Sequence, residues 1–116
     1  MKLRIHPGEL RLRLSRPEVA EFAAQGRIED SVRFAPDVRL AYRLETSSNQ
    51  DRVSVEYHDG QLRILLPEPL AAEWARTERV AIEGRQEQLS ILVEKDFQCL
   101  HKAPPVRAEV AEYPKP

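Results

Sequence analysis

The stretch VEKDFQCLHK, residues 93–102, gathers side-chain types that carry out catalysis and bind metals. It holds the single cysteine of the chain, Cys99, with Asp96 three residues before it and His101 two residues after it. A cysteine thiolate that is assisted by a histidine is a nucleophile. Asp96, Cys99 and His101 are therefore the candidate residues of a small enzyme or metalloprotein.

A packing role explains the same stretch more simply. Phe97 and Cys99 alternate with Gln98 and Leu100, as in the continuation of an apolar strand, and free cysteines are often buried. Residues two apart on a strand face the same way without necessarily touching, and no group that would orient His101 is evident. We therefore expect Cys99 to be packed rather than reactive.

A metal site would have to combine ligands from distant parts of the sequence. There is no Cys-x-x-Cys and no His-x-x-x-His pair, and transition-metal sites usually draw on at least three side chains. We expect no metal and no cofactor, and the side chains that could contribute ligands to a metal site are Cys99, His101, His6 and His58.

The elements that position these residues come from an internal repeat. A shift of 52 residues aligns LRIHPGELRLRLSRPEVAEFAAQGR with VEYHDGQLRILLPEPLAAEWARTER without a gap. This predicts two similar halves related by a pseudo-two-fold axis. The predicted single domain has a first unit over 1–46, a linker over 47–52, a second unit over 53–95 and a C-terminal segment, 96–116, packed on the body.

Each half reads as a hairpin, a helix and a second hairpin. The first hairpins turn at Pro7-Gly8 and at Asp59-Gly60, and Asp-Gly between alternating apolar runs is a strong signal for a two-residue turn. The first helix has Ser15 and Glu18 at capping-box spacing and Gly26 as its stop. The other strand pairs are predicted at 28–34 with 38–44 and at 79–83 with 89–93.

These elements predict an α+β fold with about eight mostly antiparallel strands and two helices. The strands form either a curved sheet or a barrel-like pair of sheets, and duplication of a four-stranded unit favours near-complete closure. Phe22 and Trp74 occupy matching positions on the two helices, and we expect both in the core.

The outward face of the first hairpin is strongly basic. With a two-residue turn, Arg4 lies opposite Arg11 and Lys2 opposite Arg13, which is unfavourable without compensation. We expect further arginines on neighbouring strands to face the same way: Arg33, Arg39 and Arg43. One interpretation is that acidic residues pair with the cluster across strands: Glu9, Glu29 and Glu45. The other is an anion site, and its candidate binding residues are Arg4, Arg11, Arg13, Arg39 and Arg43.

Composition narrows the class of function. With 18 basic and 19 acidic residues there is no overall charge that would gather nucleic acid or anionic lipid, and no Gly-rich phosphate loop is present. No stretch approaches the roughly 18 apolar residues of a membrane span. A single cysteine agrees with a reducing compartment, so we expect a cytoplasmic protein that binds neither membrane nor nucleic acid.

Several segments together resemble a family of small uncharacterised bacterial proteins, a domain of unknown function. The resemblance covers nearly the whole chain, and its most specific parts are the EKDFxCL segment and the aromatic-Pro-x-Pro end, here YPKP. It implies a bacterial cytoplasmic protein whose last segment belongs to the domain, and it carries over no activity, substrate or catalytic residue.

The favoured function is a non-enzymatic binding or interaction module with a basic sheet face, whose partner is an acidic protein segment or a small anion. The alternative is the enzyme or metalloprotein built around Asp96, Cys99 and His101. Leu65 and Leu92 fall on the outward face of the second half, so cover by the tail or by a second subunit, as in a homodimer, stays open.

Overall fold

The computed structural model describes residues 1–96, which form eight strands and two helices. In chain order these are β1 (Lys2–His6), β2 (Glu9–Leu14), α1 (Arg16–Gln25), β3 (Arg27–Ala35), β4 (Val38–Ser47), β5 (Ser54–His58), β6 (Gln61–Pro67), α2 (Glu68–Arg76), β7 (Ala81–Gln86) and β8 (Leu89–Lys95). The strands form two mostly antiparallel sheets, and the predicted α+β class is confirmed. No helix of residues 1–96 is both long and apolar enough to cross a membrane.

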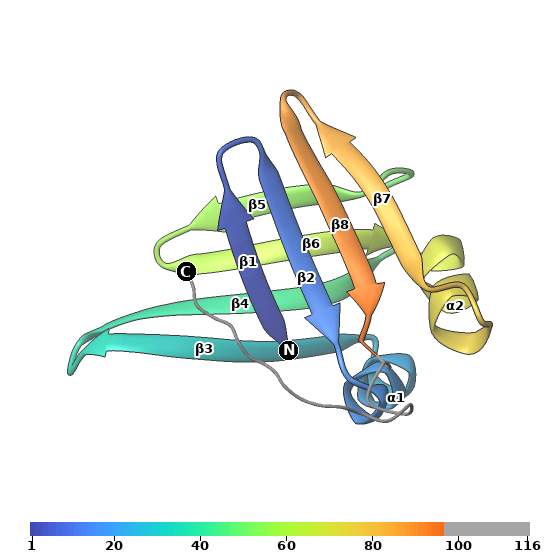
Figure 1. Ribbon diagram of the computed structural model, residues 1–116, viewed down its shortest axis with the longest axis horizontal. Coiled ribbons are helices and arrows are strands. Elements are labelled where there is room, and N and C mark those ends of the chain that lie inside the picture. Colours follow the sequence, from blue (N-terminus) through green and yellow to red (C-terminus); the bar gives the residue numbers. More distant parts are fainter. Residues whose placement is uncertain (97–116) are drawn as a thin grey trace, which may run out of the picture.

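Sheet A has the strand order β1-β2-β8-β7 and sheet B the order β3-β4-β6-β5. Each sheet is two antiparallel hairpins joined by a parallel pair, β2 with β8 and β4 with β6. In both sheets, therefore, a hairpin from one half of the chain lies beside a hairpin from the other half. The strands of the two sheets cross steeply, and the helices lie together at one corner (Figure 1).

The favoured closure into a barrel is wrong. Each of the two sheets has four strands and keeps two edge strands, β1 and β7 in sheet A and β3 and β5 in sheet B. Closure would need hydrogen-bonded ladders between these edges, and the described chain forms its ladders inside the two sheets instead.

Turn geometry fixes the register of both first hairpins. Asp59 and Gly60 both have positive φ, 52° and 79°, as the predicted two-residue turn requires, and Gly8 after Pro7 has φ 79°. The pairing that follows is the predicted one, with Arg4 opposite Arg11 and Lys2 opposite Arg13.

The first helix begins and ends where its caps predict. The Glu18 carboxylate accepts a hydrogen bond from the Ser15 backbone N–H at 2.8 Å, and Gly26 ends the helix in the left-handed conformation at φ 77°. Leu14 and Leu66, at the ends of the strands that feed the helices, are completely buried. The chain therefore turns from each central strand directly onto the core.

The core lies between the sheets and reaches under the helices. Phe22 of α1 and Trp74 of α2 are 2% and 0% exposed, and their rings meet edge to face with centroids 5.9 Å apart, so both predicted core positions are confirmed. The Trp74 indole N–H donates to the Val80 carbonyl at 2.9 Å. Lys95, 5.7 Å above the Trp74 ring, covers this corner, where burial first and the charge of Arg16 second lower its pKa.

The β7–β8 and β3–β4 hairpins differ in whether the turn end of the hairpin contacts the opposite sheet. At one corner Gln86 of β7 joins the sheets, because its side chain accepts from the Val55 N–H at 2.9 Å and donates to the Val55 carbonyl at 3.0 Å. Gly84 lies so close to Val53 that an added Cβ would come within 2.6 Å of it. At the other end the β3–β4 hairpin, which we call the arm, continues past β1 (Figure 1) and has an irregular register between Arg33 and Ala35.

Candidate binding face

Four cationic side chains lie on the part of the outward face of sheet A that β1 and β2 form, and we call this surface the basic face. It is made by the cross-strand pairs Lys2 with Arg13 and Arg4 with Arg11 on β1 and β2. Leu10, Leu12 and Leu14 alternate with the arginines of β2 and are buried, so the strand period itself sends Arg11 and Arg13 outward.

One carboxylate from the parallel neighbour partly balances this face. Glu94 of β8 lies opposite Arg13, and its Oε2 is 3.0 Å from Arg13 Nε and 3.7 Å from Arg11 Nε. Glu9 Oε2 is 3.6 Å from Arg11 Nη2. Lys2 Nζ is 3.8 Å from the Asp96 carboxylate. Three of these four contacts are 3.6 Å or longer, and the 3.0 Å contact of Arg13 Nε with Glu94 lacks hydrogen-bond geometry, so the pairs neutralise charge without forming hydrogen bonds.

The unsatisfied donors are specific atoms. The Nε atoms of Arg11 and Arg13 are buried and have no hydrogen-bond partner among the described residues, although their guanidinium groups are partly exposed. Arg4 is exposed, and its side chain makes no ion pair or hydrogen bond within residues 1–96. The face therefore presents cations in excess of the carboxylates that reach them, and guanidinium forks suit planar carboxylates.

The outward face of sheet B shows the opposite arrangement. Arg43 contacts Glu29 at 2.9 Å and Glu45 at 3.4 Å, while Arg63 contacts Glu45 at 3.0 Å and Glu56 at 2.9 Å. The side chains alternate in sign across all four strands, and we call this row the charge ladder. The predicted cross-strand pairing is thus confirmed for Glu29 with Arg43, whereas Glu45 contacts Arg43 within β4 and reaches across strands to Arg63.

The charge ladder changes the pKa values of its members. The hydrogen bond from Arg63 lowers the pKa of the Glu45 carboxyl, burial opposes it, and Arg43 adds to the lowering. In return Glu45 raises the pKa of Arg63, and Glu29 is the main cause of the raised pKa of Arg43. The arginines of the charge ladder, Arg43 and Arg63, are therefore neutralised by carboxylates of the same sheet.

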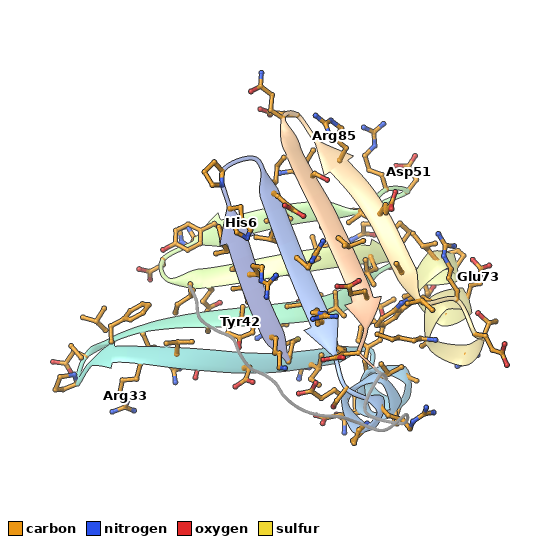
Figure 2. All side chains as sticks on the ribbon, in the orientation of Figure 1. His6, Arg33, Tyr42, Asp51, Glu73 and Arg85 are labelled. Atoms are coloured by element: carbon orange, nitrogen blue, oxygen red, sulfur yellow. The ribbon has the colours of Figure 1, made fainter. Side chains whose placement is uncertain are left out.

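The expectation that one basic cluster spans both hairpins of the first half is wrong. Arg33, Arg39 and Arg43 lie on β3 and β4 of sheet B, whereas Arg4, Arg11 and Arg13 lie on sheet A. Figure 2 shows Arg33 on the arm, far from His6 on β1. The reason is topological, because the neighbour of β2 is β8 rather than β3. Arg33 and Arg39 instead form a separate like-charged pair near the tip of the arm.

The histidines and the carboxylate of the first motif are placed apart. His6 is exposed opposite Glu9, and His58 is exposed opposite Gln61 in the other sheet. Asp96 donates its backbone N–H to the Leu14 carbonyl at 2.7 Å and its side chain faces Lys2. Cys99 and His101 lie outside the described residues. Within residues 1–96, no three metal-ligating side chains gather at one place.

An apolar groove that the sequence pattern did not predict lies between the arm and the ends of the two first hairpins. It has a volume of about 570 Å³ and draws its rim from both sheets: Ile5, Phe34, Val38 and Tyr57. The signal in the sequence was the pair of large apolar residues that flank the Ala35-Pro36-Asp37 turn, Phe34 and Val38. Alternation assigned them to strands but not to an uncovered surface.

Comparison with known proteins identifies a family for this chain but no activity. A family model described as "Family of unknown function (DUF7009)" matches residues 1–116. No curated protein and no solved structure matches the chain. The family model alone covers far more than half of the sequence, and the chain belongs to this family of unknown function.

Proposed function

We propose that this chain is a non-enzymatic binding module that holds an acidic protein segment on its basic face. The observation that carries the proposal is the difference between the two outer faces. In the charge ladder Arg43 and Arg63 each pair with two carboxylates, whereas on the basic face Arg4 makes no ion pair with any of residues 1–96 and lies directly opposite another cation, Arg11.

The chemistry of this face favours an extended acidic segment over a compact anion. The cations follow two adjacent strands in cross-strand pairs, Lys2 with Arg13 and Arg4 with Arg11, so they form a band rather than a cradle. Carboxylates along an extended chain repeat at the spacing of a strand, about 3.3 Å per residue. We place the module in a bacterial cytoplasm, since a single cysteine suits a reducing compartment and the sequence resembles small bacterial proteins.

The test uses a fluorescein-labelled decapeptide of alternating Glu and Ser and measures binding to the full chain by fluorescence anisotropy. The variant Lys2→Glu with Arg4→Glu reverses two exposed charges and leaves the contacts of Arg11 and Arg13 with Glu94 in place. Each exposed charge pair is worth about 0.2–1 kcal/mol, so two reversals should weaken binding about tenfold or more. Raising the salt concentration should weaken binding to the unaltered chain as well.

The matched control reverses two exposed cations of the other sheet, Arg33→Glu with Arg39→Glu, which face each other on the arm. It changes the net charge by the same amount on a different sheet, and it should leave affinity within about twofold of the unaltered chain. Equal loss in both variants would indicate a net-charge effect, and loss in the control alone would move the site to the arm. Competition by free citrate at low concentration would indicate a small-anion site instead.

A further inference from the structure

The arm and the first hairpins leave an apolar groove open to solvent. Leu10 of β2 and Leu62 of β6 form its floor. The side chains of its rim are 54% to 66% exposed, and they are Ile5, Phe34, Val38 and Tyr57. Among the large exposed apolar side chains of residues 1–96, only Val80 lies away from the arm and the groove. Scattered apolar side chains on a surface are ordinary, but a contiguous apolar patch marks a site that something covers.

The described residues end near this region, at Asp96, and residues 97–116 follow in the sequence. Asp96 follows β8, donates to the carbonyl of Leu14 and faces the side chain of Lys2 at the first residue of β1. Ile5, on the groove rim, lies three residues further along β1, which is about 10 Å at the rise of a strand. Residues 97–116 can span up to about 66 Å when extended, so the groove is within their reach.

The chemistry of this segment suits the groove better than the basic face. Residues 103–116, APPVRAEVAEYPKP, contain four prolines and Tyr113, and their two acidic and two basic side chains cancel. Proline-rich segments dock in grooves lined by aromatic side chains, and their fixed φ reduces the entropy lost on binding. Phe34 of β3 and Tyr57 of β5 supply two exposed aromatic rings to the lining of this groove.

Attachment also favours the chain's own segment over a second copy. A segment tethered close to its site has an effective concentration of the order of millimolar, which exceeds the concentration of another copy in ordinary solution. We propose that residues 103–116 of the same chain lie extended in the groove, with their prolines and Tyr113 packed on Phe34 and Tyr57. The groove is then an internal docking site for a proline-rich segment, independent of the basic face.

A spin label at the end of the full chain tests this proposal. Cys99→Ser with Pro116→Cys leaves one thiol for a nitroxide, and amide signals of the isotope-labelled protein are compared with the nitroxide oxidised and reduced. The proposal expects the amides of Ile5, Phe34 and Tyr57 to lose most of their intensity. Gln25 and Arg76, at the ends of the helices near the opposite corner (Figure 1), should keep theirs.

Matched variants separate docking from chance proximity. Phe34→Ser with Tyr57→Ser removes the two aromatic rings and should restore the groove signals, whereas Val80→Ser, which removes an equally exposed side chain elsewhere, should leave them broadened. Uniform weak broadening in the unaltered groove would overturn the proposal. Broadening that appears only when labelled and isotope-enriched chains are mixed would also overturn it, because the occupant would then be a second copy.

Discussion

The β7–β8 hairpin forms one side of sheet A and the arm, β3–β4, forms one side of sheet B, yet within residues 1–96 only the first is hydrogen-bonded to the opposite sheet near its turn. β7 and β8 have 6 and 7 residues and finish at the clamp between Gln86 and Val55. β3 and β4 have 9 and 10 residues and continue into solvent with Val32, Phe34 and Val38 exposed. The longer arm thus extends beyond sheet A and forms one wall of the apolar groove, whereas the shorter β7–β8 hairpin forms no such wall.

This difference shows how one topology can give a closed corner and an open one. At the closed corner a single amide satisfies both backbone groups of Val55, and Gly84 lets the strands approach. At the other corner the N-terminal ammonium of Met1 contacts Glu18 and the Tyr42 hydroxyl donates to the Met1 carbonyl at 3.0 Å, while the arm runs on beyond them. Polar contacts thus hold the β7 corner and the base of the arm, whereas apolar side chains line the open groove beside the rest of the arm.

The largest expected effect contrasts one apolar residue in each hairpin. Ile82 of β7 is completely buried, and Ile82→Ala should lower the free energy of unfolding by about 2–5 kcal/mol, since it leaves a cavity. Val32 of the arm is 43% exposed, and Val32→Ala should change the free energy of unfolding by about 0.5 kcal/mol or less. Urea denaturation of the two variants measures both. Similar losses would contradict the contrast and indicate that the arm packs as a second core.

A smaller effect concerns the clamp. Gln86→Ala removes both hydrogen bonds to Val55 and should lower the free energy of unfolding by about 1–2 kcal/mol, because the Val55 backbone is partly buried. Hydrogen exchange at the Val55 amide should also become faster, because this N–H loses its acceptor. The control is Gln88→Ala, two residues further along in the turn, where the side chain is exposed and bonds to none of residues 1–96. If both variants behave alike, the corner is held by packing rather than by the clamp.

Features set by neighbouring residues could be predicted from the sequence. Two-residue turns at Pro7-Gly8 and Asp59-Gly60 fix which residues face each other, so the pairs on the basic face followed without a structure. Helical spacing likewise placed Phe22 and Trp74 in the core. In each case a few adjacent residues determine the geometry, and distant parts of the chain do not enter.

Features that depend on which strands become neighbours could not be predicted. Alternation in β2 is the same whether its partner is β3 or β8, so nothing local placed Arg39 and Arg43 on a different sheet from Arg11. For the same reason the contact of Glu94 with Arg13 could not be predicted, because it depends on the parallel pairing of β2 with β8. The groove could not be predicted either, because Phe34 and Val38 have the pattern of ordinary strand residues and become exposed only because sheet A does not extend over them.

The smallest expected effect tests the other contrast, between the charge ladder of sheet B and the basic face of sheet A. Folding lowers the pKa of Glu45, chiefly through Arg63, so the folded state binds its proton less tightly than the unfolded state does. The stability that this carboxylate contributes is therefore fully present above its ordinary pKa, about 4.3, and is lost as the pH falls through the folded value. Glu45→Gln should cost up to about 1 kcal/mol near pH 7 and little in strongly acidic solution.

The control for this pH dependence is Glu21→Gln on α1, because Glu21 is exposed and makes no ion pair with any of residues 1–96. Urea denaturation at neutral and acidic pH should give the unaltered chain and Glu21→Gln nearly the same stability at both. For Glu45→Gln the difference should close on acidification, and adding salt at neutral pH should narrow it too, since both treatments weaken the same attraction. A cost that persists in acid would mean that Glu45 acts through packing. The contrast between the internally paired charge ladder and the basic face would then be one of geometry and would contribute no difference in free energy.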